Sequence, residues 1–110
     1  AGAFTDDDIL AQAMLKAGNV SDERIWRLPL GKEFRKHIQS DIADIKNLGK
    51  ENFAENVAAA EFLRTFVRNN AWIHIDSAGV SWTREDSLYN KKGPTGFGVR
   101  LFEAFIRNVI

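Results

Sequence analysis

Apolar residues recur every three or four positions in three stretches of the chain, which is the spacing of a buried helix face. The first stretch begins after Thr5-Asp6-Asp7-Asp8 and runs to Ala17, with Gly18-Asn19 predicted as its left-handed stop. We expect the Thr5 hydroxyl to accept an amide hydrogen bond at the helix start, where the carboxylates face the positive end of the helix dipole. The second stretch covers residues 53–67 and the third residues 98–110.

A shorter helix is predicted over residues 31–39, with Phe34 and Ile38 facing inward. Residues 25–30 are expected to be extended, because Pro29 excludes a continuous helix. Residues 40–49 and 77–95 carry turn residues and no sustained apolar period, so both are predicted as loops.

Ala71-Trp72-Ile73-His74-Ile75-Asp76 is rich in aromatic and β-branched residues and predicts a strand. A lone strand leaves its backbone amides and carbonyls unpaired, so it needs a neighbour. Either residues 26–30 pair with it, or it joins strands from a segment outside this chain. We favour the second alternative.

The composition narrows the class of protein. The chain has 110 residues, is 45% hydrophobic and contains eight Phe and three Trp, enough for one packed domain or part of one. Lysine plus arginine equals aspartate plus glutamate at 15 each, so we expect neither nucleic acid nor a membrane surface as a partner. The sequence has no Cys, no apolar run long enough to span a membrane and no leader pattern, which favours a cytoplasmic location.

The two histidines are too far apart to form a zinc-binding pair on one helix. His37 is expected to be a solvated helix residue. His74, inside an apolar strand, is expected to be a hydrogen-bonded core residue rather than a catalyst. Asp41 and Asp44 could face one cation, but capping and loop-tying hydrogen bonds are favoured over a metal site.

Two further arrangements are chemically suggestive. A hydrolytic triad could be assembled on paper from Ser77, His74 and Asp76. We discount it, because side chains of neighbouring residues along one strand do not converge on one point. The glycine-rich segment Gly93–Gly98 precedes a helix and could bind an anion through its amides. It matches neither phosphate-loop pattern, so close backbone packing is favoured there.

The order of motifs along the chain is the most informative feature. This succession resembles the leucyl aminopeptidase (cytosol aminopeptidase) family, in the C-terminal part of its metallopeptidase catalytic domain, from Phe4 to about Ile106. The matching segments are Phe4-Thr5-Asp6-Asp7, Arg24–Leu30, Ser40–Asn47, Ala59-Ala60 with Phe62-Leu63, Trp72–Gly79 and Gly93–Leu101.

The resemblance implies an α/β fold. Residues 1–110 would form a single-domain fragment of a helix-flanked mixed sheet, helix-rich with one or two strands in this chain. The family removes N-terminal amino acids from peptides with two divalent cations, zinc or manganese. Its metal ligands and catalytic Lys and Arg lie N-terminal to the matched region, so we expect this chain to bind no metal and to be inactive alone. The implied partners are the missing N-terminal catalytic portion, a peptide substrate and, for the full enzyme, further copies of itself.

By the same match, Ala78 and Ser81 form part of the S1 pocket, which receives the substrate's first side chain. Ala78 keeps the expected small residue, whereas Ser81 replaces a commoner apolar one and leaves a preference for leucine open. Glu55 and Ala58 replace a glycine and a threonine of the family pattern, and Ser77 interrupts its Asp-Ile-Ala-Gly. An alternative function is therefore a non-catalytic paralog that acts as a protein-interaction module.

Overall fold

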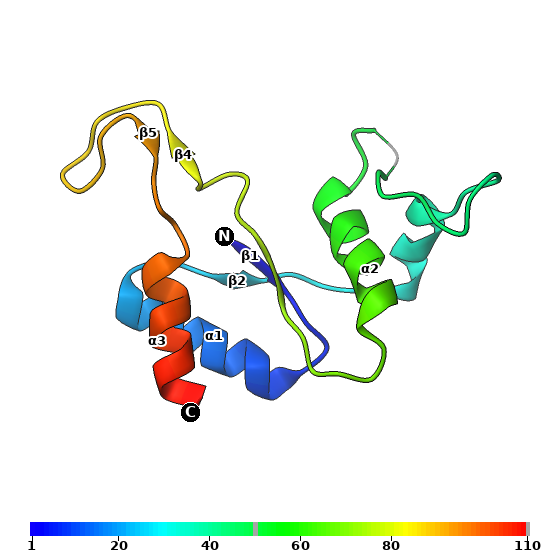
Figure 1. The fold of residues 1–110 in the computed structure, drawn as a ribbon, viewed down its shortest axis with the longest axis horizontal. Helices are drawn as coiled ribbons and strands as arrows, with labels where there is room; N and C mark the ends of the chain where they lie inside the picture. Colours follow the sequence, from blue (N-terminus) through cyan, green and yellow to red (C-terminus); the bar gives the residue numbers. More distant parts are fainter. Residues whose placement is uncertain (50, 110) are drawn as a thin grey trace.

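The structure is a computed structural model that describes residues 1–49 and 51–109. Ile110 of the predicted closing helix lies outside the described residues. The fold is mixed α/β and helix-rich, as the resemblance implies (Figure 1). The elements follow one another as β1 (Gly2–Phe4), α1 (Asp8–Ser21), β2 (Trp26–Arg27), the 3-10 helix η1 (Lys32–Ile38), α2 (Glu55–Val67), β3 (His74–Asp76), β4 (Trp82–Thr83), β5 (Gly93–Pro94) and α3 (Val99–Val109).

β1 is the central strand of a three-stranded mixed sheet with the order β2-β1-β3. It runs parallel to β2 and antiparallel to β3, so Ala3 lies opposite both Arg27 and Ile75. We expected β3 to pair with a strand from outside the chain. This is wrong for the edge of β3 that faces β1, because β1 pairs with it. β1 is too short to show a hydrophobic period, which is why the sequence did not predict it. Within the described residues, the outer edges of β2 and β3 have no partner strand.

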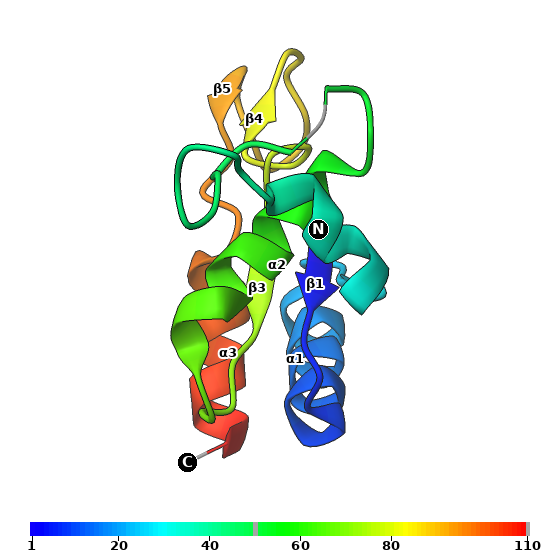
Figure 2. The ribbon, with the colours of Figure 1, turned by 90° about the vertical axis from the view of Figure 1, so that its right-hand side faces the viewer.

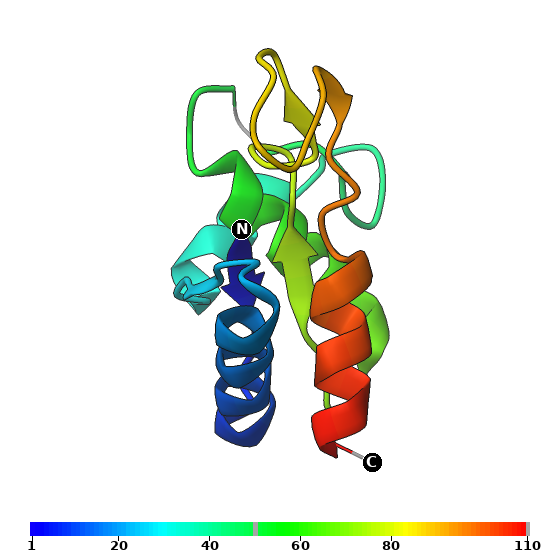
Figure 3. The same cartoon turned by 90° about the vertical axis from the view of Figure 1, so that its left-hand side faces the viewer.

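Helices cover both faces of this sheet, as Figures 1 and 3 show. The alternation of side chains along β1 separates two hydrophobic clusters, with Ala3 in one and Phe4 in the other. The first cluster lies against α1 and α3 and contains Ala3, Met14, Ala17, Ile25, Leu101 and Ala104. The second lies against α2 and η1 and contains Phe4, Val57 and Ala60, with Leu28, Leu30, Phe34 and Trp72 at its margin.

Helix α1 begins and ends at different residues from those predicted. Its N-cap is Asp7, whose Oδ1 accepts hydrogen bonds from the amides of Ile9 at 2.8 Å and Leu10 at 3.0 Å. Thr5 lies just before the helix, and its hydroxyl accepts the amide of Asp7 at 3.0 Å, as predicted, although it is not the N-cap. The same hydroxyl donates to the carbonyl of Trp72 at 2.7 Å. The helix continues through Gly18 to Ser21, because the left-handed stop is at Asp22 rather than at Gly18-Asn19.

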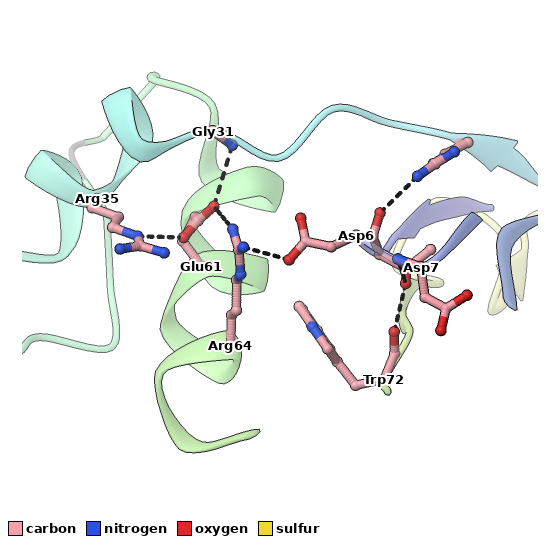
Figure 4. A network of polar contacts seen from close by, with 9 residues as sticks. Asp6, Asp7, Gly31, Arg35, Glu61, Arg64 and Trp72 are labelled. Atoms are coloured by element: carbon pink, nitrogen blue, oxygen red, sulfur yellow. Dashed lines mark hydrogen bonds and ion pairs between the residues drawn. The ribbon is translucent and has the colours of Figure 1, made fainter. Parts of the chain in front are cut away.

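Glu61 of α2 is the most deeply buried charged residue that the structure describes, and it joins α2 to η1 (Figure 4). Its side chain is 1% exposed. Oε2 accepts from Nε of Arg35 at 3.1 Å, and Oε1 accepts from Nη1 of Arg64 and from the Gly31 amide, both at 3.2 Å. Arg64 also pairs with Asp6 at the start of α1, so one polar network connects three segments of the chain. This buried carboxylate is fully satisfied, which is the condition for burying it without a large cost.

Strands β4 and β5 form a two-stranded antiparallel hairpin inside the region predicted as loop. Trp82 lies opposite Pro94, and Thr83 lies opposite Gly93. Figures 1 and 2 show this hairpin projecting from the body of the molecule, beyond the ends of β1 and β3. Among the helices that the structure describes, none is long and apolar enough to cross a bilayer.

Candidate functional site: a groove beside β3

The largest concavity that the structure describes is an open groove of about 880 Å³ beside β3. One wall is the strand itself and the start of the loop that follows it, and the other is the segment that leads into α2. The groove is mainly apolar, with a few polar side chains, which is the usual character of a small-molecule site. Its lining includes Leu48, Phe53, Ala59, His74, Asp76 and Ala78.

The structure separates the two residues predicted for the S1 pocket. Ala78 lines the groove, immediately beyond the end of β3. Ser81 is exposed and lies outside the groove lining, in the turn where its amide donates to the carbonyl of Ser77 at 2.9 Å. Only the first of the two predicted positions therefore faces the concavity.

His74 is one of two titratable side chains that β3 contributes to the groove, the other being Asp76. Burial lowers the pKa of its imidazole below the ordinary value, and the nearby Asp76 carboxylate partly opposes this shift. The ring is half-buried and stacks on Phe4, with 5.9 Å between ring centroids. Among the contacts that the structure describes, the imidazole stacks on Phe4 and makes none of the predicted hydrogen bonds. Its lowered pKa favours a neutral ring at pH 7.

Asp76 shapes the loop after β3 instead of activating a nucleophile. Its Oδ1 accepts a hydrogen bond from the Ala78 amide at 3.1 Å, which forms a local Asx-type turn. Within the described residues, no hydrogen bond links Ser77, His74 and Asp76 as a triad. The two side chains at positions 74 and 76 share one face of the strand, as the two-residue period requires.

The donors in this groove do not fit a two-metal centre. Over residues 1–49 and 51–109, no three His, Cys, Asp or Glu side chains meet in an arrangement that could hold a metal ion. Glu55, His74 and Asp76 line the groove, but they do not come together as a ligand set. One oxygen of each carboxylate already accepts an amide, that of Asn52 for Glu55 and that of Ala78 for Asp76. Asp41 and Asp44 are both exposed, and it is the hydroxyl of Ser40 that ties their loop, by accepting the amides of Ile42 and Ala43.

His37 differs from its prediction as a solvated residue. It is 8% exposed and packs against Phe53, with ring centroids 4.8 Å apart. Phe53 lines the groove, so this buried contact supports the wall opposite β3. The helical pattern placed His37 among charged neighbours on the outward face and gave no signal of this contact, because the partner comes from a distant loop.

The glycine-rich segment before α3 does receive an anion, but from within the chain. Oε2 of Glu23 accepts the amides of Gly98 at 3.1 Å and Leu101 at 2.8 Å, and its side chain is 6% exposed. Gly98 has a φ of 102°, a conformation that favours glycine. The helix start is therefore occupied by an internal carboxylate, which agrees with the preference for close packing over phosphate binding.

Comparison with known proteins assigns the family. Residues 1–103 match the cytosol aminopeptidase family in its catalytic domain. The chain belongs to the cytosol aminopeptidase family. Among its relatives are proteins named "Probable cytosol aminopeptidase" from Ehrlichia ruminantium, 44% identical over 107 residues, and from Sinorhizobium fredii, 45% identical over 107 residues. A third, from a Synechococcus species, is 47% identical over 100 residues.

These matches cover 91% to 97% of this chain but only 19% to 21% of the relatives. The chain thus spans about a fifth of the length of the curated relatives it matches, in their C-terminal region. The family is one of metallopeptidases. The resemblance seen in the motifs and the mixed α/β fold are confirmed.

Proposed function

We propose that this chain forms one wall of the substrate cleft of a two-metal aminopeptidase, and that its groove beside β3 is part of the S1 pocket. The observation that supports this most directly is the position of Ala78, which lies in the largest described groove. A small side chain there leaves room for the first side chain of a peptide. The chain then supplies shape, while the chemistry comes from residues outside it.

The two divalent cations belong to that outside portion in this proposal, with zinc or manganese as the metal. The potential donors that line the groove, Glu55, His74 and Asp76, do not come together as the ligand set that such a centre needs. The chain alone is therefore expected to be inactive. Its own residues would orient the substrate's first side chain, and His74, neutral near pH 7, adds no positive charge close to the substrate's amino group.

The partner in this proposal is the N-terminal portion of the same polypeptide. Several apolar side chains remain exposed on α2 and α3, and both outer sheet edges are unpaired within the described residues. An additional strand and further helices would cover them, as a peptidase domain of the relatives' length requires. The exposed residues are Leu63 and Phe66 on α2 and Val99, Phe102 and Ile106 on α3. A cytoplasmic location and assembly of the full enzyme into a homo-oligomer belong to the same proposal.

The pocket assignment is tested by Ala78→Leu in a hybrid in which this chain replaces the matching 107 residues of the Ehrlichia ruminantium relative. The added side chain would occupy the groove, so kcat/KM for leucine amide should fall by about tenfold, and that for alanine amide by less. Ala43→Leu, at an exposed position outside the groove, is the matched control and should change neither value.

Ser81→Leu decides whether the second predicted position also reaches the substrate. A preference for smaller first residues would support a place for Ser81 in the pocket. Unchanged kinetics for Ala78→Leu, in a hybrid that is active and folded, would contradict the S1 assignment.

A further inference from the structure

The loop 77–81, which carries Ala78 and Ser81, has little packing beneath it. It leads into the β4-β5 hairpin, which projects from the body (Figure 2). An open depression of about 410 Å³ lies between the hairpin and the body, lined by Val80 and Thr95 on one side and by Glu23 and Trp26 on the other. Solvent rather than packed side chains occupies this side of the loop, so hydrogen bonds at the base of the hairpin contribute to its position.

Thr95 makes these hydrogen bonds from directly opposite the loop. Its hydroxyl donates to the carbonyl of Val80 at 2.7 Å, and its amide donates to the carbonyl of Ser81 at 3.0 Å. The same hydroxyl accepts the Phe97 amide at 3.2 Å. One half-buried side chain thus ties the end of the loop to the segment that enters α3.

The segment that carries Thr95 is itself anchored in the body. Three residues after it, Gly98 donates to the buried Glu23 carboxylate, which also accepts the Leu101 amide. Glu23 follows α1, and α1 packs against α3. Hydrogen bonds to Glu23 thus hold one end of the segment 95–98, and hydrogen bonds from Thr95 connect its other end to the loop 77–81.

We propose that Thr95 is a positioning residue that sets the width of the S1 groove by holding the loop 77–81. The other end of the loop is fixed by Asp76, which accepts the Ala78 amide. Loss of the Thr95 hydroxyl releases the Val80 carbonyl, while the Thr95 amide still holds the carbonyl of Ser81. The loop is then loosened at Val80 and can shift relative to the groove. This inference rests on the proposed function, since the loop must contact the substrate for its position to affect specificity.

The test uses Thr95→Val, which keeps the side-chain shape and removes the hydroxyl, in the hybrid with the Ehrlichia ruminantium relative. The ratio of kcat/KM for leucine amide to that for alanine amide should fall by about fivefold, mainly through KM. Thr95→Ser restores the hydroxyl and should restore the ratio. Thr5→Val is the matched control, because the Thr5 hydroxyl also donates to a carbonyl at 2.7 Å and accepts one amide. Neither Thr5 nor its carbonyl partner Trp72 belongs to the loop or to the groove lining.

Hydrogen exchange of the loop amides provides a second readout that does not depend on activity. Exchange across residues 77–81 should be about tenfold faster in Thr95→Val than in the parent, and unchanged in Thr95→Ser and Thr5→Val. Unchanged exchange in Thr95→Val overturns the proposal that the Thr95 hydroxyl holds the loop. Faster exchange with an unchanged substrate ratio overturns its role in specificity. A folded but inactive parent hybrid contradicts the proposed function instead, and the exchange result still decides whether Thr95 holds the loop.

Discussion

At the scale of single residues, the chain buries a small number of polar side chains and gives each a definite partner. Glu61 accepts hydrogen bonds from two arginines and a backbone amide, and Glu23 accepts two amides at the start of α3. His74 is different, because its ring is half-buried mainly through contact with Phe4 and the groove. Burial penalises its charged form, and this makes the stability of the chain depend on pH.

His74 should destabilise the fold as the pH falls. Its folded-state pKa is lowered, so below about pH 6.5 the unfolded chain takes up a proton more readily than the folded one. The stability that neutral His74 contributes is therefore present above this value and is lost on acidification. The midpoint of thermal unfolding should fall less between pH 8 and pH 5 in His74→Gln than in the parent chain. An equal fall in both proteins would show that His74 does not contribute.

At the scale of elements, one buried carboxylate connects η1 to α2 (Figure 4). Glu61→Leu would leave Arg35 and Arg64 without their shared partner and the Gly31 amide without an acceptor. We expect the free energy of unfolding to fall by about 2 kcal/mol. This loss is smaller than that for breaking a fully buried ion pair, because both arginines are partly exposed. The measurement is urea unfolding.

Glu103→Gln is the control for that substitution. Glu103 is a half-exposed partner of Arg107 one turn along α3, and exposed pairs of this kind contribute little. Its unfolding midpoint should stay close to that of the parent. Equal effects of the two substitutions would mean that burial of Glu61 does not determine its contribution.

The elements also show what the sequence could predict. The three main helices follow from apolar periodicity over eleven to fourteen residues, and their predicted positions are confirmed with shifts of a few residues at the ends. β1 and the β4-β5 hairpin were missed because two or three residues carry no period, and pairing partners up to 74 positions apart decide them. The Asx-type turn at Asp76 carries a local signal, whereas nothing near Thr95 or Glu23 indicates their distant partners.

The same limit applies to the groove. Family motifs located Ala78, because its neighbours along the chain are characteristic. The opposite wall comes from the segment before α2, where Glu55 departs from the family pattern, and local sequence gave no indication that Phe53 packs on His37. Contacts that join loops remote in sequence require the fold before they can be seen.

At the scale of the whole molecule, the central sheet is packed on both faces, whereas its two outer edges are unpaired within the described residues. The mixed sheet has helices on both faces and separates two hydrophobic clusters, while the described outer edges of β2 and β3 are open. The chain spans about a fifth of the length of its relatives, and in the proposed function an N-terminal portion covers these open edges. A non-catalytic interaction module would instead pair these edges with a second copy of itself, and its mass in solution would be that of an oligomer.

The most direct measurement is the hydrolysis of leucine amide, with and without added manganese or zinc, by the 110-residue chain and by the hybrid with the Ehrlichia ruminantium relative. We expect no turnover by the chain alone under any condition, and metal-dependent turnover by the hybrid. Metal-dependent turnover by the chain alone, in a sample whose intact mass shows nothing longer, would contradict the claim that the catalytic metals are held by residues outside it.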